Sequence, residues 1–225
     1  MGQSLLLPKR RYLQIAFNDD LDQARRVLRS LPRNDRLLVE AGTPFIKKEG
    51  FRGVEVVASL WQGKVVADIK TMDGATGEVD MVAMAGATAA TALGVAPRET
   101  LNLFIARCRK LKLVSMVDML GTQEPLRVLM GLQQPPDVVV LHKGRDEEST
   151  RGKVIPYKQI NKIRSKYSML ISAAGGIDLK EARSAIFNGA DIVVANLVSR
   201  DDPWIGINSE EDVRKIAVEF LKTIG

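Results

Sequence analysis

The sequence predicts an α/β fold, a (β/α)8 TIM barrel, from three observations. The chain has 225 residues and is 45% hydrophobic, enough to bury a large core. Short apolar segments of strand length alternate with segments of helical periodicity, and this strand and helix unit occurs eight times. We therefore expect residues 1–225 to form one barrel domain. Because periodicity cannot detect closure of a sheet, a doubly wound open sheet is the alternative.

Turn and capping residues delimit the expected elements. Segment 18–20 offers caps for the first helix, and segment 42–44 ends the second strand. Pro97 is well placed at the start of the fourth helix. The expected strands cover residues 12–17, 37–41, 64–69, 89–93, 113–117, 138–141, 169–173 and 192–194. The expected helices cover residues 21–30, 53–60, 77–85, 99–110, 124–132, 156–166, 178–188 and 209–222.

Composition narrows the function classes. The net charge of +6 permits an anionic partner. Basic residues are scattered among acidic ones and aromatics make up only 5%, so a phosphorylated small molecule is favoured over nucleic acid. No apolar segment approaches the ~20 residues of a membrane span. The N-terminal residues lack a secretory pattern and Cys108 is the single cysteine, which predicts a cytoplasmic protein without an internal disulfide.

Polar residues gather at the carboxyl ends of the expected strands, the face on which barrel enzymes carry their active sites. In segment 65–74 an apolar strand runs directly into three charged residues. Each polar residue alone fits a structural role, such as a salt bridge or a helix cap. Their coincidence at one face predicts a shared active site. The residues concerned are Asn18, Glu40, Asp68, Lys70, Asp73, Asp118, His142, Gly175 and Gly176.

The residue types suggest metal-assisted chemistry. Glu40, Asp68 and Asp118 are carboxylates at the ends of different strands, and the chain has one cysteine and one histidine. Hard oxygen ligands of this kind suit Mg²⁺ better than Zn²⁺. A metal held in this way can polarise a carbonyl and stabilise an enediolate.

Lys70 would supply a fixed positive charge beside the metal, and Asp73 would hold Lys70 protonated or position a water. His142 is suited to proton transfer near neutral pH. A Schiff-base role for Lys70 is the rival interpretation, although flanking carboxylates favour a protonated amine that is not nucleophilic. Gly175 and Gly176 precede an expected helix, which suits a phosphate-binding turn.

A resemblance to a known family rests on seven segments, which are Leu13–Ala16, Glu40–Pro44, Ala67–Asp73, Leu93–Ala96, Met116–Asp118, His142 and Ala174–Gly176. In order and spacing they resemble the 3-hexulose-6-phosphate synthase branch of the orotidine-phosphate decarboxylase superfamily, from about residue 12 to residue 195. The resemblance implies a phosphate-binding barrel that is active as a homodimer with sites at the subunit interface. It also implies that Glu40 and Asp68 bind Mg²⁺, that Lys70 stabilises an enediolate, that Asp73 reaches into the partner's site, and that Asp118 and His142 serve substrate binding and proton transfer.

The implied reaction is a reversible aldol addition. Ribulose 5-phosphate loses a proton at C1, and the resulting 1,2-enediolate adds formaldehyde to give 3-hexulose 6-phosphate. A relative, 3-keto-L-gulonate-6-phosphate decarboxylase, reaches the same intermediate by loss of CO₂ and is the alternative function. Arg145, in an H-x-x-R pattern after His142, resembles that decarboxylase.

The sequence also departs from the family pattern. Asn18 stands where the first strand of the family usually ends in Asp, and it is expected to contact substrate. No glycine follows the eighth strand in residues 194–200, so we expect Arg200 to help Gly175 and Gly176 bind phosphate. A divergent paralogue that binds a sugar phosphate without turnover is therefore a further alternative.

Overall fold

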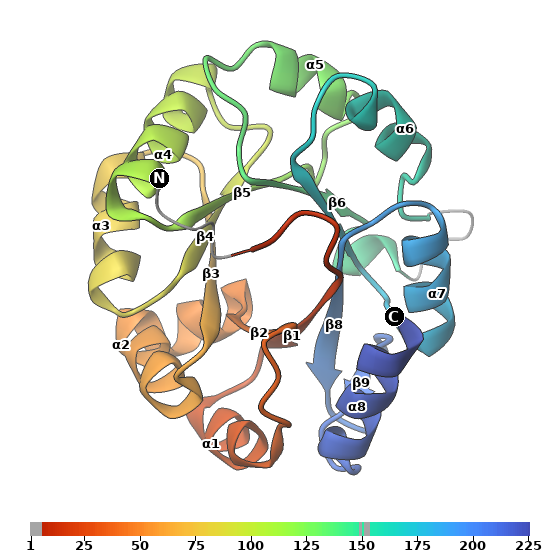
Figure 1. The fold of residues 1–225 in the computed structure, drawn as a ribbon. Coiled ribbons are helices and arrows are strands. Elements are labelled where there is room, and N and C mark those ends of the chain that lie inside the picture. The colour runs from red at the N-terminus through yellow and green to blue at the C-terminus, as the bar shows by residue number, and fades with distance from the viewer. Residues whose placement is uncertain (1–5, 149, 151–153) are drawn as a thin grey trace.

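The computed structural model describes residues 6–148, 150 and 154–225, and it confirms the closed barrel (Figure 1). Neighbouring strands are parallel and follow the chain order, and the first strand pairs with both the second and the eighth. This last pairing closes the sheet and excludes the open doubly wound alternative. The strands are β1 (Tyr12–Phe17), β2 (Leu37–Ala41), β3 (Lys64–Thr71), β4 (Ala89–Leu93), β5 (Val114–Asp118), β6 (Val138–His142), β7 (Leu170–Ala174) and β8 (Ile192–Val198).

Helices surround the barrel as an outer layer (Figure 1). They are α1 (Leu21–Ser30), α2 (Thr43–Trp61), α3 (Ala75–Met84), α4 (Arg98–Leu111), α5 (Pro125–Met130), α6 (Lys158–Arg164), α7 (Leu179–Phe187) and α8 (Val213–Thr223), with a short 3₁₀ helix η1 (Arg145–Glu147) after β6. Within the described residues, no helix combines the length and the apolarity needed to cross a membrane.

Several elements differ from expectation, and α8, for example, begins at Val213 instead of residue 209. Helix α2 begins at Thr43, ten residues before the expected start at residue 53, and it is kinked at Gly50, where φ is +65°. Strand β8 continues to Val198, whereas we expected it to end at residue 194. A two-residue strand, β9 (Ile207–Asn208), then pairs in parallel with the end of β8 and was not expected.

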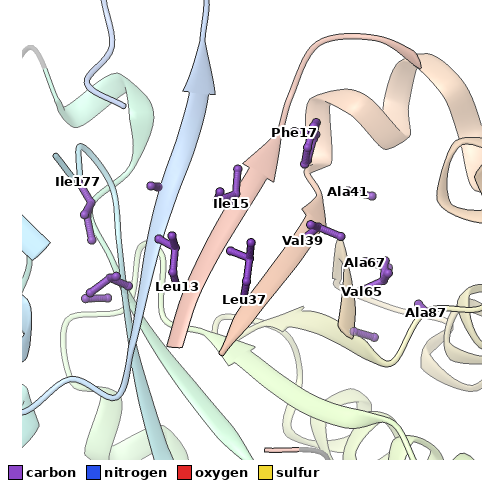
Figure 2. Close-up of a cluster of buried hydrophobic side chains, with 14 of the residues drawn as sticks. Leu13, Ile15, Phe17, Leu37, Val39, Ala41, Val65, Ala67, Ala87 and Ile177 are labelled. Carbon is purple, nitrogen blue, oxygen red and sulfur yellow. The ribbon is translucent and has the colours of Figure 1, made fainter. Parts of the chain in front are cut away.

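Alternating side chains along each strand divide the core into two parts. Figure 2 shows Leu13, Ile15 and Phe17 along β1, with Leu37 and Val39 along β2. These side chains belong to the large core between the strands and the helices. Because successive strand residues point to opposite faces, the intervening residues point into the barrel.

The barrel interior is apolar at its base and polar near the carboxyl ends of the strands. Tyr12, Leu38 and Val66 are buried in the inner cluster. Glu40 lies two residues after Leu38 on β2, and Asp68 lies two residues after Val66 on β3. Both therefore point into the barrel, and both are buried. The alternation that builds the core therefore delivers these two carboxyl groups to one end of the barrel.

Strand β3 carries an irregularity at the residues that matter most for the site. Ala67 pairs with Ala90, but the next pair is Thr71 with Ala92, so three residues of β3 oppose one residue of β4. Within this bulge Lys70 has φ of +48°, the left-handed region that residues other than glycine rarely adopt. Bulges of this kind re-aim side chains and occur next to active sites.

Candidate active site

The carboxyl ends of the strands enclose one cavity of about 460 Å³. Eight of the residues predicted from sequence line it, which brings together side chains from six strands and the loops that follow them. They are Asn18, Glu40, Asp68, Lys70, Asp118, His142, Arg145 and Gly175. The polar residues at the strand ends therefore lie together around this cavity. Their roles stay predictions.

Lys70 is held between two carboxylates. Its Nζ lies 2.9 Å from Asp68 Oδ2 and 2.7 Å from Asp118 Oδ2. Burial acts to lower the pKa of Lys70, but attraction by Asp68 and Asp118 outweighs it, so the pKa lies above its ordinary value. The amine is therefore an ammonium group at neutral pH, fixed at the cavity wall.

Asp118 also orients the histidine. Its Oδ2 lies 2.8 Å from His142 Nδ1, and its Oδ1 accepts a hydrogen bond from the Leu120 amide at 3.0 Å. Burial favours neutral Asp118, yet His142 and Lys70 together hold its pKa well below the usual range. Burial likewise favours neutral His142, and Asp118 reverses this and raises the pKa of the imidazole. Since Nδ1 faces Asp118, Nε2 is the ring atom left for a substrate.

Glu40 forms no ion pair with a cation of the described residues. It is buried, and Gln14 Nε2 donates a hydrogen bond to its Oε2 at 2.5 Å. Burial and the nearby charge of Asp68 raise the pKa of Glu40 to about 8. The Oε1 atom of Gln14, also buried, has no hydrogen-bond partner within the described part of the chain. Glu40 is therefore largely protonated at neutral pH, and this corner of the cavity holds more oxygen acceptors than the described neighbouring groups satisfy.

Asp68 is fixed by hydroxyl groups as well as by Lys70. Thr91 Oγ1 donates to Asp68 Oδ1 at 2.8 Å, and Thr43 Oγ1 lies 2.8 Å from Oδ2. Thr43 can also donate to the backbone oxygen of Asp68, at 2.7 Å. Both carboxylate oxygens are thereby held in position while they face the cavity.

The turn after β7 has the conformation expected of an anion-binding loop. Gly175 and Gly176 have φ of +103° and +64°, and a Cβ on Gly175 would lie 2.0 Å from Lys143 O, so no side chain fits there. A Cβ on Gly176 would lie 3.2 Å from Lys143 Nζ and 3.4 Å from Glu148 Oε2. One ammonium group and one carboxylate therefore face this turn.

Three of the predicted residues are not found among the described residues that line the cavity, namely Asp73, Gly176 and Arg200. Gly176 is buried just behind Gly175. Asp73 is exposed and lies beyond the end of β3 at Thr71, so Asp68 and Asp118 hold Lys70 protonated in its place. The described residues show no ion pair between Asp73 and Lys70, and the role of Asp73 at the site stays a prediction.

Arg200 also lies elsewhere than expected. Its side chain is 78% exposed, and its Nε is 3.9 Å from Glu210 Oε2. Strand β8 runs four residues further than predicted, which carries Arg200 beyond the cavity. The expected contact of Arg200 with the turn at Gly175 is therefore absent from the described structure, and Lys143 is the cation at that turn.

Arg145 lines the cavity from η1. Its guanidinium carbon lies 4.4 Å from the ring centre of Trp204, a cation–π contact between the loops that follow β6 and β8. The Ile205 amide donates to Glu148 Oε2 at 3.3 Å, which joins the same two loops a second time. These contacts hold the loops together beside the turn at Gly175.

The structure adds residues that the sequence reasoning missed. Gln14, Thr43, Thr91 and Asn196 all line the cavity, and Asn18 Nδ2 donates to Asn196 Oδ1 at 3.1 Å. A usable signal existed for two of them. Gln14 and Thr91 are isolated polar residues inside otherwise apolar strands, at the alternate positions that point into a barrel.

Comparisons with known proteins agree with this architecture. Among solved structures, 3-hexulose-6-phosphate synthase from Salmonella typhimurium superposes with a TM-score of 0.81 at 24% identity, over 95% of this chain and 98% of that one. KGPDC from Streptococcus mutans superposes with a TM-score of 0.73 at 21% identity, over 96% and 98% of the two chains. At these identities the similarity establishes the fold.

Sequence similarity is higher to longer proteins. A bifunctional enzyme Fae/Hps from Methanothrix thermoacetophila is 38% identical over 215 residues, which are 95% of this chain and 52% of the relative. The protein of the same name from Methanospirillum hungatei is 36% identical with the same coverage. The chain thus spans about half the length of the curated relatives it matches. The model of the orotidine 5'-phosphate decarboxylase / HUMPS family matches residues 11–196, and the chain belongs to this family.

Proposed function

We propose that this chain is a 3-hexulose-6-phosphate synthase, which adds formaldehyde to ribulose 5-phosphate through a 1,2-enediolate. The observation that carries the proposal is the buried Lys70 ammonium, 2.7 Å from Asp118 and 2.9 Å from Asp68 at the wall of a single cavity. A fixed cation in a water-poor site stabilises negative charge that develops on a substrate oxygen. The similarity to relatives named Fae/Hps supports the choice of reaction.

Lys70 acts electrostatically in this proposal. Its raised pKa keeps the amine protonated at neutral pH, and a protonated amine cannot attack a carbonyl to form a Schiff base. The left-handed backbone at Lys70 and the two carboxylates preorganise the charge before substrate arrives. This disfavours the Schiff-base alternative.

His142 moves the proton. Its neutral form accepts the C1 proton of ribulose 5-phosphate at Nε2, and the imidazolium then returns a proton to the formaldehyde oxygen as the carbon–carbon bond forms. Asp118 steadies the charged ring through Nδ1. Because Asp118 raises the pKa of His142, the neutral imidazole is a stronger base than free histidine.

We also propose that Glu40 and Asp68 hold Mg²⁺. Their environment fits a divalent cation, because the pKa of Glu40 is raised to about 8 partly by the charge of Asp68. The described residues contain no group of three or more histidine, cysteine or carboxylate side chains arranged for a metal. The remaining ligands would be water and substrate oxygens, as is usual for Mg²⁺. When bound, the ion would supply Lewis-acid polarisation of the ketose carbonyl.

For the phosphate we propose the turn at Gly175 and Gly176, with Lys143 as its cation. Glycines at positive φ are common in turns whose backbone amides bind anions, and Gly175 lines the cavity. Glu148 lies at the same turn, so its negative charge opposes phosphate binding. We expect this residue to limit affinity for the sugar phosphate.

A homodimer with interface sites is part of the proposal. Asp73 is exposed just beyond β3, and beside it Met72 is 44% exposed. On α3, Met81 and Met84 are also exposed, and residues three apart share one helix face. An interface that places Asp73 in the site of a second subunit requires an apolar surface next to Asp73.

The buried free thiol of Cys108 suits the cytoplasm, where we place the protein.

The deciding experiment is an assay of the purified protein. Formaldehyde-dependent loss of ribulose 5-phosphate should occur with Mg²⁺, should stop in excess chelator, and should return when Mg²⁺ is added back. Lys70→Ala should abolish turnover, whereas Arg200→Ala, the matched loss of a cation outside the cavity, should not. Full activity in chelator would overturn the metal assignment, and no turnover by the wild type would overturn the function.

A second candidate is 3-keto-L-gulonate-6-phosphate decarboxylase, and the position of Arg145 favours it. Arg145 lines the cavity three residues after His142, where a guanidinium could reach an enediolate. Its contact with Trp204 directs the group toward the loop after β8. Both reactions share one intermediate, and the electrophile that captures it decides the product.

A further inference from the structure

We propose that Thr91 is a positioning residue. Its hydroxyl fixes the left-handed backbone of Lys70 and the carboxylate of Asp68 relative to each other. The bulge in β3 creates the need for such a group. Between the pairs Ala67–Ala90 and Thr71–Ala92 the ladder is interrupted, so the amide of Lys70 has no backbone carbonyl of β4 in register with it. A buried amide without an acceptor is costly, and a side chain must replace the missing carbonyl.

Thr91 provides that replacement. It is the one residue of β4 opposite the bulge, and its side chain points into the barrel. The Lys70 amide donates to Thr91 Oγ1 at 2.9 Å, and Thr91 Oγ1 donates its single proton to Asp68 Oδ1 at 2.8 Å. Thr91 is only 4% exposed, so water is poorly placed to substitute for the hydroxyl.

One hydroxyl therefore links the two halves of the ion pair. Lys70 Nζ donates a hydrogen bond to Asp68 Oδ1 at 3.0 Å. This bond closes a ring that runs from the Lys70 amide through Thr91 and Asp68 to the Lys70 side chain. Thr43 supports Asp68 from its other oxygen, whereas Thr91 also sets the backbone conformation that aims Lys70 into the cavity. Loss of the hydroxyl should let the bulge relax and move the ammonium group.

The same pair of strands offers a matched control. Thr88, just before β4, accepts a hydrogen bond from the Val65 amide at 2.8 Å and donates to Val65 O at 3.0 Å. Like Thr91, this hydroxyl accepts a hydrogen bond from an amide of β3, but it donates to a backbone carbonyl instead of a carboxylate, and it lies at the opposite end of the barrel. Thr88→Val therefore removes an equivalent bridge between β3 and β4 without touching the cavity.

The test compares Thr91→Val, Thr91→Ser and Thr88→Val with the wild type. Hydrogen exchange of the Lys70 amide should accelerate by roughly tenfold or more in Thr91→Val and stay near the wild-type rate in Thr91→Ser. Thr88→Val should leave the Lys70 amide protected and expose the Val65 amide. If Thr91→Val does not fold, Thr91→Ala removes the hydroxyl without placing a methyl group against the Lys70 amide.

The effect on turnover rests on the proposed function and is measured separately. In Thr91→Val, kcat for formaldehyde addition should fall roughly 10–100-fold with KM changed less than about threefold, and Thr91→Ser should restore kcat. Thr88→Val should lower thermal stability and keep kcat. Unchanged exchange at Lys70 in Thr91→Val, or an equal loss of kcat in Thr88→Val, would overturn the role of Thr91. If the wild type has no turnover, the function fails while the exchange experiment still decides the positioning role.

Discussion

Replacing Glu40 by Gln should stabilise the metal-free protein, and the gain should depend on pH. Glu40 is buried beside Asp68, and these surroundings disfavour its ionised form. A glutamine has nearly the same shape, stays neutral, and keeps an oxygen that can accept the hydrogen bond from Gln14. The substitution therefore removes the cost of a buried charge while it preserves the packing.

The size of the effect follows from the pKa. Folding raises the pKa of Glu40 from 4.5 to about 8. Below pH 4.5 the group is protonated in both states, so the wild type and Glu40→Gln should have similar free energies of unfolding. As the pH rises above 4.5, the unfolded chain releases a proton that the folded chain retains, so the free energy of unfolding of the wild type falls. The loss should reach about 3 kcal/mol at neutral pH and about 5 kcal/mol above pH 8 as an upper limit.

Urea unfolding in excess chelator, followed by circular dichroism from about pH 5 to about pH 8, measures this difference. Asp118→Asn is the control of opposite sign, because the low pKa of Asp118 means that its charge stabilises the folded protein at neutral pH. Adding Mg²⁺ should stabilise the wild type and have little effect on Glu40→Gln. A stability difference between wild type and Glu40→Gln that is equal at both ends of the pH range would refute the reasoning.

The remaining predictions concern the dimer, the phosphate and the choice of reaction. Mixing inactive Asp73→Asn with inactive Lys70→Ala should restore part of the activity, because one site of a mixed dimer then contains only wild-type residues; no recovery despite subunit exchange would place Asp73 outside the partner's site. Glu148→Gln should lower KM for ribulose 5-phosphate several-fold by removing a like charge beside Gly176, whereas Arg200→Ala should leave KM unchanged, and the reverse pattern would restore Arg200 as the phosphate cation. The ratio of kcat/KM for the aldol reaction to that for 3-keto-L-gulonate 6-phosphate decarboxylation should favour the aldol in the wild type; a ratio that favours decarboxylation and collapses in Arg145→Ala would identify the decarboxylase.

The barrel and the grouping of the site could be predicted because both follow from strand periodicity. Side chains alternate along a strand, and parallel strands in a barrel end at the same face. Glu40, Asp68 and Asp118 each follow an apolar strand segment, so their meeting at one cavity needed no knowledge of loop structure.

Features that depend on exact strand length and backbone conformation could not be predicted. The left-handed conformation of Lys70 arises from pairing between β3 and β4, and nothing in the local sequence signals it, since lysine has no preference for positive φ. The continuation of β8 depends on its pairing with β9, and it is this extension that places Arg200 outside the cavity. Lys143 was overlooked because its position beside Gly176 depends on the close approach of two loops.

The three carboxylates converge as expected, yet their surroundings give them different chemistry. Asp118 contacts both Lys70 and His142, so its negative charge is balanced by protein groups. Asp68 also contacts Lys70, whereas the hydrogen bond that the described residues make to Glu40 comes from the neutral amide of Gln14. Glu40 therefore stays largely protonated at neutral pH unless a cation binds between it and Asp68. A cation supplied from solution would satisfy this pair, which supports the proposal that Glu40 and Asp68 hold Mg²⁺ while Asp118 serves Lys70 and His142.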